Sequence, residues 1–323
     1  MNRNFLFSLF SVLVIGALLM LPTGCKNDDA VSPTATENLA SEDAANVIAG
    51  EVGTESGGVN DMLSDMTDFH NSPLFAHQGG GFGGGHQNPV GTGRYGTYTR
   101  TYDPATQTWT VVVEASFQNA MRSASWRREY QYFFSKNGTK QQFFITNGVM
   151  ADKITFTIVE NGCSGQFTNP RVSHQLTALR GSAEATVGIS NGDTLLTVNS
   201  LAPRYRAGID SIKIRGGLRT SNHNLTLTLT NVVVPARIDQ YLPEQTIGGR
   251  TFRNVRPISG TISGTYNAFM TFQRGDAYSE REVTRNFTID FGATTGESVN
   301  VEITGVNAAR LRARIHLQTG ELL

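Results

Sequence analysis

The chain has 323 residues, a formal net charge of zero and two cysteines. Two cysteines exclude a fold held together by several disulfides. A chain of this length buries most of its surface on folding, so it does not need them.

The first 25 residues have the pattern of a secretion signal. A positive start, Asn2-Arg3-Asn4, precedes an apolar run from Phe5 to Leu21 that only Ser8, Ser11 and Gly16 mildly interrupt, and small residues lead to Gly24-Cys25. A basic segment, an apolar segment and small residues before a cut site are typical of a secretory signal peptide. A cysteine directly after Gly24 resembles the signal of bacterial lipoproteins, which is cleaved before a cysteine that is then acylated. The alternative is an uncleaved N-terminal transmembrane helix, for which this apolar run is at the short limit.

The lipoprotein resemblance implies a location. Residues 1–24 would be the signal peptide, and Cys25 would be the lipidated N-terminus that anchors the protein to the outer membrane. Lys26-Asn27-Asp28-Asp29 resembles the charged stretch of surface-exposed lipoproteins of Bacteroidota, so either the periplasmic face or the cell surface is implied. With Cys25 acylated, Cys163 has no partner within the chain. Its turn-like neighbours indicate a small residue near a loop rather than a catalytic thiol.

Residues 25–92 form an acidic tether that includes two short helices. Ala30 to Ala40 is rich in Thr, Ser, Ala and Pro, which predicts an unstructured stretch. Ser41 is expected to cap the first helix, and Gly57-Gly58 to end it. In the second helix the apolar residues Val59, Met62, Leu63, Met66 and Phe69 share one face. Helices this short are not stable alone, so they should dock on the β domain or on a partner, or remain partly formed.

The net charge of zero hides an asymmetry. Residues 25–90 hold one base and ten acids, for a net charge of −9, whereas residues 91–323 hold 25 bases and 17 acids, for a net charge of +8. All but four of those 25 bases are arginines, whose planar fork binds carboxylate or phosphate bidentately. The asymmetry predicts that the acidic segment attracts the β domain, or that a charged partner binds.

A glycine-rich linker and then a change of period mark the start of the β domain at residues 93–323. Gly79 to Gly85 is flexible by composition and lacks the Lys-Ser/Thr pair of a phosphate loop. From Arg94 onward apolar and polar residues alternate, and turn residues such as Asn137-Gly138 predict hairpins. One expected hairpin pairs residues 126–134 with residues 141–146. About a dozen such strands predict an all-β antiparallel domain, either a sandwich, a barrel or a curled sheet.

Three motifs that suggest chemistry have simpler explanations. Gly188 to Gly192 matches the G-x-S-x-G pattern of serine hydrolases, but the flanks are two strands and predict a hairpin tip. The six histidines have neither the helical nor the cysteine spacing of a zinc site, so no metal is expected. A glycosidase would need paired carboxylates, and the closest pair, Glu280 and Glu282, is bracketed by arginines.

The arginines near the C-terminus are the stronger signal. Arg310, Arg312 and Arg314 alternate with apolar residues, which predicts three guanidinium groups in a row on one face of a strand. Aligned like charges repel unless acids on the next strand or an anionic ligand compensate them. The candidate acids are Glu280, Glu282 and Glu302. The candidate ligands are an anionic glycan, a lipid headgroup or the acidic N-terminal segment.

These observations favour an outer-membrane lipoprotein whose β domain is a non-enzymatic binding or structural module without a cofactor. The first alternative is a carrier that encloses an apolar ligand, such as a lipid chain, in its curled sheet. Such a carrier needs a continuous apolar cavity, whereas a structural module packs that volume shut. A glycan-active enzyme is a further alternative. Nucleic acid is not expected as a partner, because the aromatic residues do not alternate with the bases as stacking platforms would.

Overall fold

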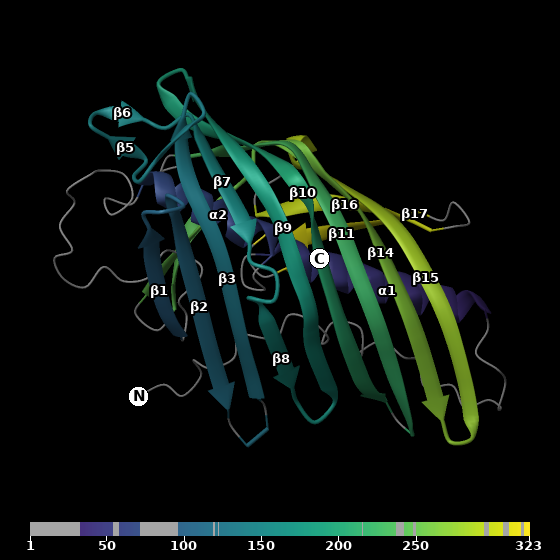
Figure 1. Cartoon of the computed structure of the whole chain (residues 1–323). Coiled ribbons are helices and arrows are strands. Elements are labelled where there is room, and N and C mark those ends of the chain that lie inside the picture. Colours follow the sequence, from purple (N-terminus) through teal and green to yellow (C-terminus); the bar gives the residue numbers. More distant parts are fainter. Residues whose placement is uncertain are drawn as a thin grey trace.

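The computed structural model describes residues 33–53, 58–71, 96–118, 120–121, 123–214, 216–236, 242–247, 250–293, 297–305, 310–317 and 320–323. Two helices, α1 (Pro33–Val52) and α2 (Val59–Asn71), precede a large antiparallel sheet (Figure 1). The expected all-β class, with two short helices ahead of the sheet, is therefore confirmed.

The sheet has 13 strands among the described residues, in the order β1-β2-β3-β7-β9-β10-β11-β14-β15-β16-β17. Strand β4 pairs with β3, and β8 fills the gap between β3 and β9. The first half comprises β1 (Gly96–Asp103), β2 (Thr108–Gln118), β3 (Ser123–Lys136), β4 (Thr139–Gln141), β7 (Lys153–Ile158), β8 (Ser164–Thr168) and β9 (Val172–Ser190). The second half comprises β10 (Asp193–Ile214), β11 (Gly217–Pro235), β14 (Ser259–Arg274), β15 (Ala277–Asp290), β16 (Ser298–Thr304) and β17 (Arg310–His316).

Short elements complete the fold. Two separate hairpins are β5 (Ile145–Thr146) with β6 (Val149–Met150), and β12 (Leu242–Ile247) with β13 (Arg250–Asn254). A 3-10 turn, η3 (Phe291–Ala293), follows β15.

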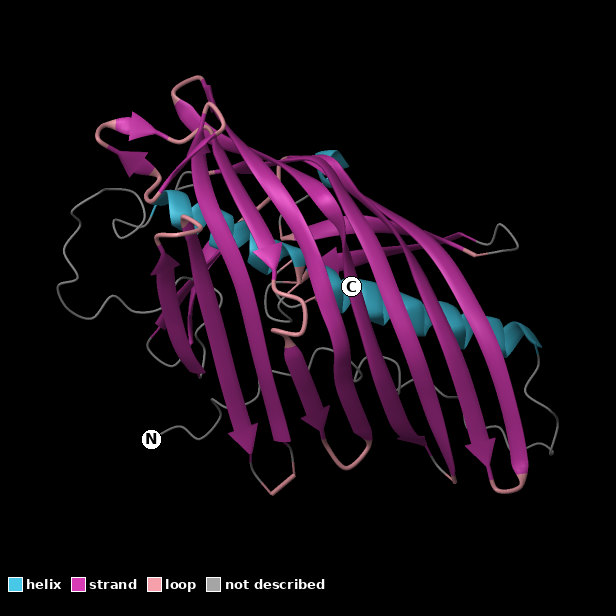
Figure 2. Ribbon diagram, in the orientation of Figure 1, coloured by secondary structure: helices cyan, strands magenta, loops and turns pink. Residues whose placement is uncertain are grey.

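The sheet curls around the two helices. Both helices run across its concave side, behind the long strands as drawn (Figure 2). Helix α1 contacts β15 and β17, and α2 contacts β11 and β13. Of the architectures left open by the sequence, the structure is therefore a curled sheet, and its hollow side holds the N-terminal helices.

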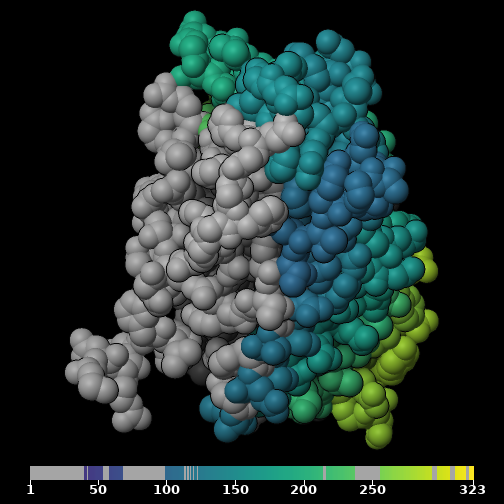
Figure 3. Space-filling view, turned by 60° about the vertical axis from the view of Figure 1, so that its left-hand side comes forward, coloured from purple at the N-terminus to yellow at the C-terminus, as the bar shows by residue number. Residues whose placement is uncertain are grey.

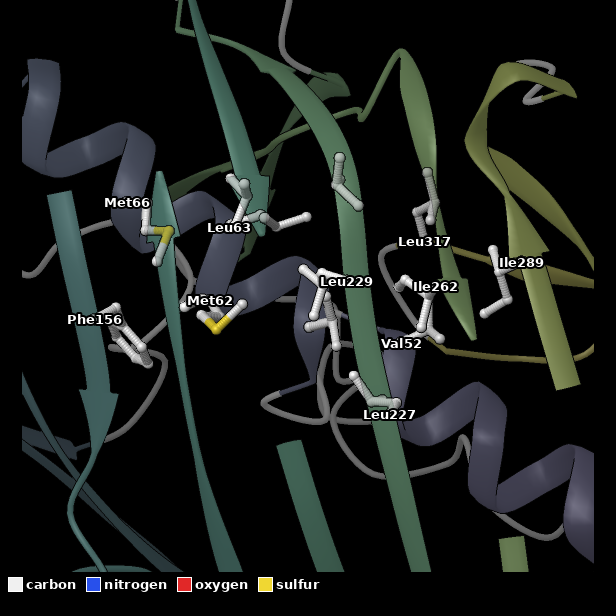
Figure 4. Close-up of a cluster of buried hydrophobic side chains, with 14 of the residues drawn as sticks. Val52, Met62, Leu63, Met66, Phe156, Leu227, Leu229, Ile262, Ile289 and Leu317 are labelled. Carbon is white, nitrogen blue, oxygen red and sulfur yellow. The ribbon is translucent and has the colours of Figure 1, made fainter. Parts of the chain in front are cut away.

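One apolar core joins the helices to the sheet. Alternate residues of the strands point inward, as the strand period requires, and they meet apolar side chains from both helices (Figure 4). The labelled members are Val52, Met62, Leu63, Met66, Phe156, Leu227, Leu229, Ile262, Ile289 and Leu317. All of them are at most 4% exposed, so the helices are part of the core rather than an appended segment.

The first helix begins earlier than expected. It starts at Pro33, and Ser41 therefore lies inside the helix instead of capping it. Proline is favoured at the first position of a helix, because its missing N–H would be unpaired there anyway. The Ser41 hydroxyl instead accepts a hydrogen bond from Nε of Arg285, at 3.3 Å. The expected break near Gly57-Gly58 is confirmed, since α1 ends at Val52 and α2 begins at Val59.

The turn residues in the sequence correctly predicted where hairpins occur. They did not predict the length of each strand. Asn137 and Gly138 both have positive φ and join β3 to β4. However, β4 is only three residues long, and β2 pairs with the rest of that edge of β3, from Ser123 to Tyr132. The expected strand at 141–146 is wrong because the chain bends away after Gln141, whose side-chain amide donates to the carbonyls of Phe143 and Phe144, each at 2.8 Å.

Candidate functional site

The concave side contains buried ion pairs between the helices and the sheet. At the end of α1, Glu51 is fully buried and accepts hydrogen bonds from two arginines of β10. One comes from Nε of Arg204, and the other from Nη1 of Arg206, at 2.9 Å. Burial by itself raises the pKa of Glu51, but the attraction and hydrogen bonds of the two arginines outweigh it, so the pKa is lowered. Glu51 is therefore a carboxylate at neutral pH.

A glycine on the neighbouring strand lets Arg204 reach this position. Gly181 has φ +147°, and a Cβ there would lie 2.8 Å from Cα of Arg204. The register between β9 and β10 shifts on both sides of Ala202, immediately before Arg204. Arg204 and Arg206 keep the inward parity of Leu196 and Val198, because β10 gains two residues relative to β9 at this irregularity. Gly181 thus leaves room for Arg204 on the inner face at the point where α1 ends.

Helix α2 makes a second buried ion pair. Arg128 of β3 binds Oδ2 of Asp61, and its Nη2 lies 3.7 Å from Oδ2 of Asp65. The three side chains are at most 8% exposed. Burial lowers the pKa of Arg128, but the two carboxylates raise it by more, and the guanidinium stays charged. Since i and i+4 residues share one helix face, one arginine can bind both acids.

The first half of α1 has its own polar contacts. Nη2 of Arg219 lies 2.7 Å from Oδ1 of Asp43, and Arg285 contacts Ser41. Four helix acids therefore meet four sheet arginines on the inner face. This confirms the predicted attraction between the acidic segment and the β domain, and the predicted docking of Val59, Met62, Leu63 and Met66. The side chain of Phe69 lies outside the described part of the chain.

Beside these pairs lies a cluster of titratable groups that the sequence did not reveal. We call it the histidine cluster: His174 of β9, Asp210 of β10 and His223 of β11. Nδ1 of His174 is 2.5 Å from Oδ1 of Asp210, and Nδ1 of His223 is 3.3 Å from Oδ2 of the same carboxylate. A Cβ at Gly208 would lie 3.1 Å from Nε2 of His223, so a residue without a side chain leaves room for the rings. The ring of Tyr266 stacks on His223, with centroids 6.0 Å apart.

The environment fixes the charges of the histidine cluster. Burial is the largest effect on His223 and, with the nearby positive groups, lowers its pKa to about 4. Burial raises the pKa of Asp210, but the hydrogen bond and charge of His174 and the charges of His223 and Arg206 lower it overall. At neutral pH the cluster is thus an ionised carboxylate beside a neutral His223. It can exchange protons, but among the described side chains no nucleophile is hydrogen-bonded to either imidazole, as covalent catalysis would require.

We expect stability to fall as the pH falls from about 6.5 to about 4. In this interval the unfolded chain protonates His223, while the folded chain, with its pKa near 4, does not. The full difference is on the order of 3 kcal/mol of unfolding free energy, reached near pH 4. Denaturant unfolding across this range measures it, and His223→Gln should remove that part of the slope. An NMR titration in which the His223 ring protonates above pH 6 would contradict the assignment.

The predicted arginine row lies on the outer face at the end of the sheet. Arg310, Arg312 and Arg314 alternate along β17 as exposed residues, so the predicted alignment is confirmed. Glu302 of β16 lies between two of them, 3.5 Å from Nη1 of Arg310 and 3.5 Å from Nε of Arg312. Arg314 donates to the Ser298 hydroxyl. Two guanidinium groups, 64% and 78% exposed, therefore share one carboxylate.

Of the three acids proposed to compensate this row, only Glu302 does so. Glu280 accepts a hydrogen bond from the hydroxyl of Tyr278, at 3.1 Å. Glu282 is opposite Phe269 in the register of β14 and β15. Both acids precede the part of β15 that pairs with β16, which explains why they do not reach the row.

Three further candidates from the sequence remain: Cys25, the Gly188–Gly192 motif and Cys163. Cys25 lies outside the described residues. The Gly188–Gly192 motif is a hairpin tip between β9 and β10, as expected. Cys163 is half-buried, and burial raises the pKa of its thiol, which keeps it protonated and unreactive.

Comparison with known proteins does not assign the chain to a family. In the described part of the chain, no helix combines the length and the apolar character needed to cross a bilayer. No family model, curated protein or solved structure matches the chain.

Proposed function

We propose that this chain is a lipid-anchored protein of the outer membrane whose β domain is a non-enzymatic binding or structural module. The N-terminal signal pattern and Cys25 support the anchor. The observation that supports a module over a carrier is the filled concave side: side chains of α1 and α2 pack against the inward residues of the sheet in one core. A carrier would need that volume for its ligand. Among the described residues, the outer face of the sheet is a surface that a partner can reach.

The carrier alternative is tested with a fluorescent fatty acid. A packed interior offers no site, so titration of the purified protein should give only weak, non-saturating binding. Saturable uptake of one ligand per chain, competed by unlabelled fatty acid, would instead support the carrier and contradict the module.

The anchor is tested at Cys25. Cys25→Ala removes the thiol that would receive the lipid, so the precursor should remain uncleaved or the protein should be released from the membrane. One acyl chain binds a membrane only marginally and several bind stably, so loss of acylation has a large effect on fractionation. Normal processing with unchanged membrane association would contradict the lipoprotein assignment.

The arginine row is the proposed contact for an anionic partner, either a glycan or a lipid headgroup. Replacing Arg310, Arg312 and Arg314 together by Gln keeps side-chain length while removing three charges. Anion binding should fall and weaken with added salt, because exposed charges are screened beyond about 8 Å at physiological ionic strength. The fold should survive, since exposed ion pairs contribute only ~0–1 kcal/mol each. A variant that unfolds, with a parent that binds no anion, would show that the row only pairs with Glu302.

A further inference from the structure

The register of the sheet extends the arginine row into a larger surface. Outward residues of β11, β14 and β15 form what we call the outer polar face: Asn224, Thr226, Thr228, Ser263, Thr265, Asn267, Thr284, Asn286 and Thr288. Cross-strand pairing runs from Thr226 through Thr265, Asn286 and Thr304 to Arg310. The next row runs from Thr228 through Ser263, Thr288 and Glu302 to Arg312.

These rows cross five adjacent strands. With about 4.8 Å between strands, each row is roughly 19 Å long. The long strands follow one another across the convex surface, from blue β1–β3 to yellow-green β14 and β15 (Figure 3). Because β16 and β17 continue the same sheet after β15, the outer polar face and the arginine row lie on the same face of it.

The outer polar face is neutral and ordered. All nine side chains are hydroxyls or amides. Carboxylates border it at Glu282 and Asp290 on β15 and at Glu302 on β16, and Glu302 is paired with Arg310 and Arg312. Cross-strand hydrogen bonds fix several of them: Thr265 donates to Asn286 and Thr284 donates to Asn267, both at 2.9 Å. Short side chains held in this way lose little conformational entropy when a ligand binds, which favours affinity.

We propose that the outer polar face and the arginine row together bind an acidic polysaccharide laid across the strands. This inference rests on the proposed anion binding by the arginine row and names the ligand class. Hydroxyl and amide groups exchange hydrogen bonds with sugar hydroxyls, and the planar guanidinium groups of Arg310 and Arg312 bind its carboxylates. Phe269, 42% exposed and two residues from Asn267, offers an aromatic ring for the apolar side of a sugar.

The same surface fits other partners less well. A membrane-binding surface inserts apolar side chains between lipids, whereas the nine residues of the outer polar face include none and Phe269 is a single ring beside them. Stable protein interfaces centre on aromatic or arginine anchors surrounded by an apolar core, whereas Arg310 and Arg312 are 64% and 78% exposed and lie at the end of polar rows. A long, neutral hydrogen-bonding surface that ends in a cationic edge is complementary to a chain of hydroxyls carrying periodic negative charges.

Calorimetry on the lipidated full chain in neutral detergent tests the proposal, with polygalacturonate as the acidic probe and dextran as the neutral one. Polygalacturonate should bind in a salt-dependent manner, and dextran at least tenfold more weakly. The variant Thr226→Val/Thr228→Val/Thr288→Val removes three hydroxyls with little change of shape and should weaken binding about tenfold. Its matched control, Thr101→Val/Thr157→Val/Thr177→Val, changes exposed threonines elsewhere on the sheet and should bind like the parent. Melting curves verify that both variants are folded.

The outcomes separate this inference from the proposal on which it rests. If the arginine-to-glutamine variant loses binding but the Thr226/Thr228/Thr288 variant binds like the parent, the arginine row binds anions alone and the extended site is wrong. If phosphatidylglycerol in mixed micelles binds and polygalacturonate does not, the ligand is a headgroup and the polysaccharide is wrong. If neither probe binds the parent, both proposals fail.

Discussion

Glu51→Gln should lower the free energy of unfolding by about 3–5 kcal/mol. The substitution keeps the size of the side chain but removes its charge, which leaves Arg204 and Arg206 buried on the inner face without their carboxylate. An uncompensated buried charge is costly because the interior cannot solvate it. Denaturant unfolding followed by circular dichroism measures the change.

A matched control separates burial from charge. Glu160→Gln breaks the ion pair between Glu160, which is 69% exposed, and Arg180, which is 52% exposed. This substitution should lower the free energy of unfolding by at most about 1 kcal/mol. Replacing Glu51, Arg204 and Arg206 together by Leu should recover much of the stability lost in Glu51→Gln, since apolar groups can replace a whole buried ion cluster. A Glu51→Gln protein within about 1 kcal/mol of the parent would refute the importance of this cluster.

Deleting residues 26–90 should abolish cooperative unfolding or sharply lower the melting temperature, and it should increase binding of a hydrophobic dye. The deletion removes ten buried apolar residues of the core: Ala40, Ala44, Ala45, Ile48, Ala49, Val52, Val59, Met62, Leu63 and Met66. It also leaves the inward arginines of the sheet without their acids. The inner face would then expose both apolar surface and unpaired charge, the two features that a folded interior excludes.

Two leucines give a milder version of the same test. Leu63 of α2 is 1% exposed and Leu201 of β10 is 58% exposed. Leu63→Ala should cost about 2–5 kcal/mol, whereas Leu201→Ala should stay within about 0.5 kcal/mol of the parent. If the deletion leaves the melting temperature and dye binding unchanged, the helices act only as a tether, contrary to the packing described above.

The sequence alone was sufficient for features that depend on near neighbours. The two-residue period predicted antiparallel strands, because successive side chains point to opposite faces. Asn137-Gly138 and Asn191-Gly192 located two hairpins, because these residues readily adopt the positive φ that such turns require. The charge asymmetry predicted that the acidic segment and the β domain attract each other, and the alternation in β17 predicted the exposed arginine row.

Other features were decided only by the tertiary structure, because they depend on residues far apart in the chain. Asp61 meets Arg128 across 67 residues, and Glu51 meets Arg204 across 153. Charge counts predict that such pairs form but not which acid meets which base. The histidine cluster likewise requires the register of three strands.

Simple alternation also failed to predict the inward side chains of one strand. In β9 the buried residues change from an even-numbered position, Val172, to odd-numbered ones, Leu179, Ala183 and Ala185, because the register with β10 shifts between Ala207 and Gly208. In β10 the parity is unchanged across the irregular register, so Leu196, Val198 and Arg204 all face inward. The start of α1 at Pro33, with Ser41 inside the helix, is a similar case: packing on the sheet and the contact with Arg285 outweigh the capping preference of a serine.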